Sequence, residues 1–117
     1  MTGITQATPA QFHDALTSGT VLLVDVREPN EYALERIPGA LLYPLSTFDP
    51  QAISGAGHKL AVHCAGGVRS LRAAQALVAS GHTHVINLDG GIKAWKAAGL
   101  PLIRIDPLSG QVVQDGR

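Results

Sequence analysis

The sequence contains a single cysteine, Cys64, and this scarcity limits its redox chemistry. One thiol cannot form a disulfide within the chain, so nothing in the sequence indicates an oxidising compartment. Positive charge is not in excess either, because nine Lys and Arg side chains are balanced by nine Asp and Glu side chains. Nucleic acids and membrane surfaces attract proteins with a basic excess, so we expect neither as a partner.

Long apolar runs are also missing. No apolar stretch approaches the roughly 18 residues that a membrane span needs. Residues 1–16 lack the basic segment and apolar run of a signal peptide. These absences predict a soluble, cytoplasmic protein. The 117 residues, of which 45% are hydrophobic, are enough for one domain with a core, and no repeat or low-complexity linker divides them.

Apolar runs alternate with helical patterns along the chain. Residues 21–26 form a continuous run of branched side chains, which is typical of a strand buried on both faces. Similar strands are predicted at Lys59–His63 and Val85–Leu88, with a helix over residues 70–79 between them. This alternation predicts an α/β domain with a mostly parallel sheet. Further predicted features are a helix opened by a Thr8–Gln11 capping box, a short helix from Glu28, a turn at 37–40, a loop at 54–58 and a helix carrying Trp95.

The stretch HCAGGVRS, residues 63–70, places the one thiol between a predicted strand and a predicted helix. A cysteine attacks only as its thiolate, and the N–H groups at a helix N-terminus favour that form. Gly66 and Gly67 allow a tight turn whose N–H groups point inward. The Arg69 guanidinium adds a pair of N–H donors that can bind an oxyanion. Ser70 either caps the helix or donates to the sulfur. The alternative is a buried cysteine acting as a small hydrophobe beside a simple glycine turn.

Four segments resemble the rhodanese family of sulfurtransferases, in particular its single-domain, thiosulfate sulfurtransferase-like members. They are LLVDVREPNEY, RIPGALLYP, VHCAGGVRSLRAAQAL and LDGGIKAWKAAGLP, and they follow one another in the family's order within residues 5–102. The resemblance implies a three-layer α/β/α fold around a mostly parallel sheet of about five strands. It places the domain at residues 1–105, with 106–117 as a tail or an edge segment.

The resemblance also implies a reaction. The Cys64 thiolate takes the outer sulfur of thiosulfate or a related donor, and cyanide or a thiol then removes it from the Cys64 persulfide. No metal or cofactor is required, and the acceptor class includes thioredoxin-like and sulfur-carrier proteins. Asp25 and Arg27 have supporting roles. Asp25 supports the loop or turn, with a direct part in catalysis as the alternative, while Arg27 pairs with Glu28 or Glu31 or adds positive charge near the site. The implied substrate-binding residues are Ala65, Gly66, Gly67, Val68, Arg69 and Ser70.

Two departures and two alternatives accompany this hypothesis. The family often has histidine where this chain has Arg36, and a basic residue where it has Ala65. Cysteine phosphatases and arsenate reductases combine a thiolate, an N–H cradle and an arginine in a similar way. Their motif resembles Cys-x5-Arg, whereas only four residues separate Cys64 from Arg69, a ring better suited to one sulfur atom than to phosphate. The other alternative is a rhodanese-like binding module without catalysis.

Overall fold

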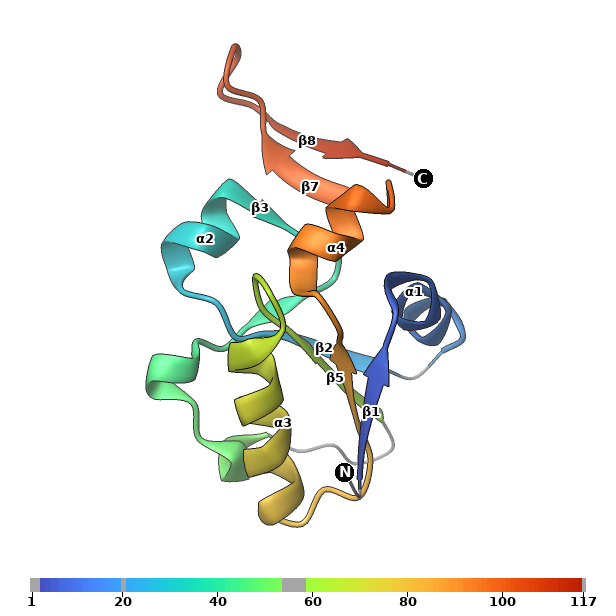
Figure 1. Cartoon of the computed structure of the whole chain (residues 1–117). Helices are drawn as coiled ribbons and strands as arrows, with labels where there is room; N and C mark the ends of the chain where they lie inside the picture. Colours follow the sequence, from blue (N-terminus) through green and yellow to red (C-terminus); the bar gives the residue numbers. More distant parts are fainter. Residues whose placement is uncertain (1–2, 20, 54–58, 117) are drawn as a thin grey trace.

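A central parallel sheet organises the protein. The computed structural model describes residues 3–19, 21–53 and 59–116 (Figure 1). Within them, the sheet has five strands in the order β1-β6-β5-β2-β4, and every pairing is parallel. The predicted sheet is therefore confirmed. Its strands are β1 (Ile4–Ala7), β2 (Val21–Asp25), β4 (Leu41–Leu42), β5 (Lys59–His63) and β6 (Val85–Leu88).

Helices cover both faces of this sheet, as the three-layer prediction requires. Helices α1 (Pro9–Thr17) and α4 (Gly91–Ala97) pack on one face, and α3 (Val68–Ala79) packs on the other. Helix α2 (Pro29–Leu34) and two short 3-10 turns, Leu45–Thr47 and Pro50–Ala52, lie in the connections. In the described part of the chain, no helix combines the length and the apolar character needed to cross a membrane.

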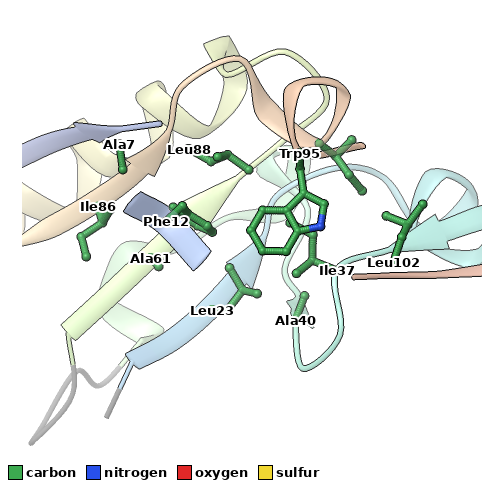
Figure 2. Close-up of a cluster of buried hydrophobic side chains, with 11 residues drawn as sticks. Ala7, Phe12, Leu23, Ile37, Ala40, Ala61, Ile86, Leu88, Trp95 and Leu102 are labelled. Atoms are coloured by element: carbon green, nitrogen blue, oxygen red, sulfur yellow. The ribbon is translucent and has the colours of Figure 1, made fainter. Parts of the chain in front are cut away.

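The core is split by the sheet because successive strand residues point to opposite faces. Leu23 joins the cluster under α1 and α4, in which Phe12 and Trp95 meet edge to face (Figure 2). Its neighbour Val24 joins the cluster under α3, where Leu77 is fully buried. Strand β2 is thus buried on both faces, as predicted, and Trp95 packs between helix and sheet.

Some local features match the sequence analysis and others differ. The Thr8–Gln11 capping box forms in both directions, at 3.2 and 3.0 Å. Helix α3 begins two residues earlier than predicted, since Gly67 serves as its N-cap with φ +102°. Strand β1 was not predicted, because it is a short edge strand with partly polar side chains. The predicted loop at 54–58 lies outside the described residues.

A second, antiparallel sheet lies beside α4 in Figure 1 and was also not predicted. It has the order β3-β7-β8, with β3 at Glu35–Arg36, β7 at Leu102–Ile105 and β8 at Val112–Asp115. Strand β8 falls within the segment 106–117, where it runs back along β7. This sheet joins the end of the chain to the segment that follows α2.

Candidate active site

The Cys64 side chain lies where β5 ends and α3 begins, at the carboxyl edge of the central sheet. Its sulfur accepts a hydrogen bond from the Gly67 N–H at 3.0 Å. The Ser70 hydroxyl lies 3.3 Å from the sulfur and 3.2 Å from the Gly67 carbonyl oxygen, so its one proton is shared between two acceptors. Ser70 is buried inside the first turn of α3, which means that it is a donor to the sulfur rather than the helix cap.

Opposing effects set the ionisation of Cys64. Burial of the thiol, which is only 1% exposed, raises its pKa. Hydrogen bonds from the Ser70 hydroxyl and from the N–H groups of Ser70, Gly67 and Gly66 lower it, and together they outweigh burial. The pKa of Cys64 therefore lies below its usual value of 9.0, which favours the nucleophilic thiolate.

Helix α4 holds the Cys64 loop from behind. The Ile92 N–H donates to the Cys64 carbonyl at 2.9 Å, and the Lys93 N–H donates to the Ala65 carbonyl at 3.2 Å. Gly91 makes this approach possible, because a Cβ atom there would lie 2.4 Å from the Ala65 carbonyl oxygen. A Cβ atom on Gly67 would likewise lie 3.3 Å from the Gly90 nitrogen. Gly90 and Gly91 were not predicted as site residues; the signal available in the sequence was this second Gly-Gly pair.

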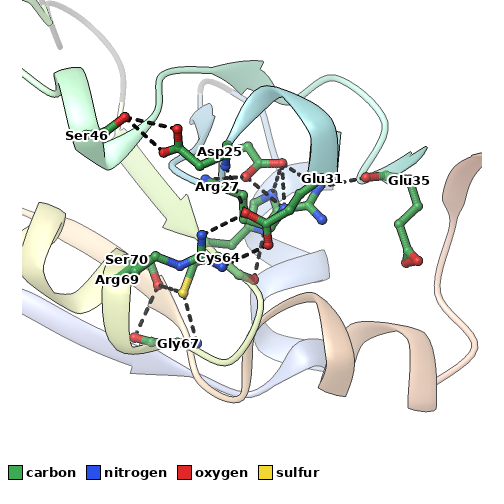
Figure 3. Close-up of polar contacts among 11 residues, drawn as sticks. Asp25, Arg27, Glu31, Glu35, Ser46, Cys64, Gly67, Arg69 and Ser70 are labelled. Carbon is green, nitrogen blue, oxygen red and sulfur yellow. Dashed lines mark hydrogen bonds and ion pairs between the residues drawn. The ribbon is translucent and has the colours of Figure 1, made fainter. Parts of the chain in front are cut away.

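Arg69 reaches across to helix α2 and forms a two-pronged ion pair with Glu31. Its Nη1 and Nη2 atoms donate to Oε1 and Oε2 of Glu31 at 2.8 and 2.9 Å (Figure 3). The hydrogen bonds from Arg69 hold the pKa of Glu31 down at about 2. The guanidinium group of Arg69, which we expected to bind the sulfur donor, therefore binds a carboxylate of the chain itself. Glu31 belongs to the site, although it was predicted only as an alternative partner of Arg27.

Asp25 and Arg27 form a buried ion pair below the site. Arg27 Nη2 donates to Asp25 Oδ2 at 2.8 Å and to the Glu35 carbonyl at 2.7 Å, while the Arg27 N–H donates to Asp25 Oδ1 at 2.9 Å. Glu28 and Glu31 are thus not its ion-pair partners; Arg27 adds positive field at Glu31 instead, which lowers the pKa of that carboxyl. The pair joins the end of β2 to the strand after α2.

His63 is fully buried next to this pair. Its Nε2 atom lies 3.5 Å from Asp25 Oδ2. Burial lowers the pKa of His63 to about 4, although the Asp25 charge opposes the shift. His63 is consequently a neutral core residue at physiological pH and lends no positive charge to Cys64.

A cavity of about 230 Å³ opens beside the loop. Ala65 lines it together with charged groups of α2, β3 and α4, namely Glu31, Glu35, Lys93 and Lys96. The other predicted loop residues, Gly66 and Val68, are exposed, and Val68 is 67% accessible. In the described residues, no group of three or more His, Cys, Asp or Glu side chains could hold a metal ion.

Comparison with known proteins places this site in a family. The profile of the rhodanese-like domain matches residues 8–98. An uncharacterized protein of Synechocystis is 39% identical over 85 residues, which cover 72% of this chain and 48% of that protein. The chain thus spans about half the length of the curated relatives it matches.

Solved structures agree with this match. A rhodanese-like domain protein from Staphylococcus aureus is 33% identical with a TM-score of 0.68, covering 78% of this chain and 90% of that one. A protein of unknown function from Rhodopseudomonas palustris, described as a possible tyrosine phosphatase, is 30% identical with a TM-score of 0.71 over 82% of each chain. The chain belongs to the rhodanese-like domain family.

Proposed function

We propose that the protein is a sulfurtransferase that carries sulfane sulfur as a persulfide on Cys64. The observation that carries this proposal is the environment of the sulfur: a 3.0 Å hydrogen bond from the Gly67 N–H and the Ser70 hydroxyl at 3.3 Å. These donors favour a thiolate without any general base. They also suit a persulfide, whose outer sulfur carries the negative charge after transfer.

The reaction has two displacement steps. In the first, the Cys64 thiolate attacks the outer sulfur of thiosulfate or a related donor. An S–S bond to Cys64 forms, the donor's S–S bond breaks, and sulfite or a thiolate leaves with the bonding electron pair. In the second, cyanide or an acceptor thiolate takes the outer sulfur and Cys64 leaves as the thiolate. We further propose a cytoplasmic setting, with a thioredoxin-like or sulfur-carrier protein as acceptor.

Phosphate hydrolysis is the second candidate, favoured by one observation. The R. palustris neighbour is described as a possible tyrosine phosphatase. In this chain, however, the Arg69 fork is bound to Glu31 by two hydrogen bonds, which leaves it closed to a phosphate. Sulfur transfer therefore ranks first.

The test is to treat the protein with thiosulfate and, separately, with cysteine persulfide, and to measure its intact mass. We expect a gain of one sulfur atom with at least one donor, its absence in Cys64→Ser, and release of thiocyanate on adding cyanide. Hydrolysis of a small aryl phosphate, measured in parallel, should be negligible. Phosphatase turnover without any added sulfur would reverse the ranking, and neither activity would favour a binding module.

A further inference from the structure

The Glu31 carboxylate binds the only arginine of the Cys64 loop. This contact affects which sulfur donors the site can bind. We propose that Glu31 selects sulfur donors by charge: it disfavours dianions such as thiosulfate and favours small organic persulfides that carry at most one net negative charge. This inference rests on the proposed sulfurtransferase function and names its donor class.

The first step is competition for the same hydrogen-bond donors. A sulfonate needs the guanidinium N–H groups of Arg69 that already bind both Glu31 oxygens, at 2.8 and 2.9 Å. A dianion entering the fork must break two charge-assisted hydrogen bonds and then lie next to the displaced carboxylate. The Glu31 carboxyl, with a pKa of about 2, stays ionised at any physiological pH, so this repulsion persists.

The second step is the charge balance around the cavity. Three cations beside the site are matched by carboxylates, in the pairs Arg27–Asp25, Arg69–Glu31 and Lys96–Glu35. Lys93 lines the cavity and has no carboxylate partner among the residues that the structure describes. One uncompensated cation matches a donor with one negative charge better than a donor with two. Ala65, which borders the cavity, is uncharged and adds no second cation.

The third step is the size and lining of the cavity. Its volume of about 230 Å³ is below the usual range for drug-sized ligands and suits a body the size of an amino acid. Leu34 and Ile92 supply apolar surface next to the charged groups, and Ala65 connects the cavity to the loop. Thiosulfate has no organic body to use this space.

The sulfur-transfer step is balanced for such a donor. The Cys64 thiolate attacks the outer sulfur of R–S–SH, the Cys64 S–S bond forms, and R–S⁻ leaves with the electron pair of the broken bond. The product is the Cys64 persulfide, and R–S⁻ takes a proton from water. No external oxidant or reductant takes part.

The test compares Glu31→Gln with the wild type and with Glu28→Gln. Glu28 lies on the same turn, but its carboxylate binds Ser46 at 3.0 Å rather than Arg69, so Glu28→Gln removes an equal charge without opening the fork. The measurement is kcat/KM for Cys64 persulfide formation from thiosulfate and from cysteine persulfide. We expect Glu31→Gln to raise the thiosulfate value about tenfold and the cysteine persulfide value about threefold at most, because the Coulomb energy of one nearby charge scales with the charge of the donor. Glu28→Gln should change neither.

Two results would overturn the inference while leaving the proposed function standing: persulfide formation from thiosulfate that Glu31→Gln does not accelerate, or an equal acceleration in Glu28→Gln. The proposed function fails separately, if neither donor adds sulfur to Cys64 in any of the three proteins.

Discussion

At the scale of single residues, Ser70 has the largest influence on the sulfur among the side chains. Its hydroxyl is buried and 3.3 Å from Cys64 Sγ, so water cannot replace it easily. A hydroxyl that stabilises a buried anion contributes more than one on the surface, because competing solvent is absent. The reactivity of Cys64 therefore depends on a neighbour that is six positions further along the chain.

Replacing Ser70 by alanine should raise the pKa of Cys64, because fewer hydrogen bonds to the sulfur then oppose the effect of burial. The ultraviolet absorbance of the thiolate reports this pKa directly, since Cys64 is the only cysteine and Cys64→Ser supplies the blank. We expect the titration midpoint of Ser70→Ala to lie at higher pH than that of the wild type. Ser80→Ala, which alters only a hydroxyl at the far end of α3, should leave it unchanged. Equal midpoints in all three proteins would remove Ser70 from this role.

Sequence distance decides which residues of the site could be predicted. Cys64, Gly67 and Ser70 fall close together in the sequence, within the stretch 63–70, so their spacing alone indicated that they would meet. Glu31 could not be placed in this way, because it is 38 residues from Arg69 and a carboxylate on a helix is usually solvated. The two possible roles of Ser70 were also left undecided, since they depend on where α3 starts.

At the scale of elements, the contact between α4 and the Cys64 loop is the critical one. The helix donates two N–H groups to loop carbonyls at 2.9 and 3.2 Å, and Gly91 allows the two backbones to approach. Gly91 also has φ +64°, which disfavours any other residue. Sequence patterns predicted both elements but not their contact, because a glycine in contact with a carbonyl looks like any other turn glycine.

Gly91→Ala tests this contact, and Gly39→Ala is its matched control. Gly39 has a similar φ of +84°, but nothing lies within 4 Å of a Cβ atom there. Both variants should lose about 1–2 kcal/mol of unfolding free energy through backbone strain. Gly91→Ala should lose a further 1–3 kcal/mol, roughly, because the loop must move away. Urea unfolding measures the difference.

The same pair of variants should differ at Cys64. A displaced loop no longer directs its N–H groups at the sulfur, so the thiolate titration of Gly91→Ala should shift to higher pH, while that of Gly39→Ala should match the wild type. Equal stability losses combined with equal titrations would contradict a special role for Gly91.

At the scale of the whole molecule, His63 links the site to overall stability. It is the last residue of β5, a central strand of the sheet, and it is fully buried beside Asp25. Burial keeps it neutral, with a pKa of about 4 in the folded protein against 6.5 in the unfolded chain. Between these two pH values the unfolded state binds one proton more than the folded state, so stability falls as pH falls.

The free energy of unfolding should accordingly decrease by about 1.4 kcal/mol per pH unit as pH falls from 6.5 towards 4. Denaturant unfolding at a series of pH values measures this slope. An NMR titration assigns it, because the His63 ring should titrate near pH 4 in the folded protein. A His63 ring that titrates near its ordinary value of 6.5 in the folded protein would contradict this explanation.

The overall architecture was largely predictable, and the second sheet was not. Continuous apolar runs at β2, β5 and β6 indicated a parallel sheet because each must be buried on both faces. Strand β3 has only two residues, and its pairing with β7 depends on a fold that local patterns do not contain. Tertiary context, rather than intrinsic preference, makes such segments extended.

The groups that surround the Cys64 sulfur belong mainly to the main chain, and α4 supports the loop that carries them. The side chains of Ala65 and Val68 contribute little to that framework, since one borders the cavity and the other faces solvent. The ionisation of Cys64 and the lining of the adjoining cavity are therefore separable properties of this protein. In the proposed sulfurtransferase, positions 65 and 68 can change during evolution or engineering to suit new sulfur donors, while Cys64 keeps its ionisation.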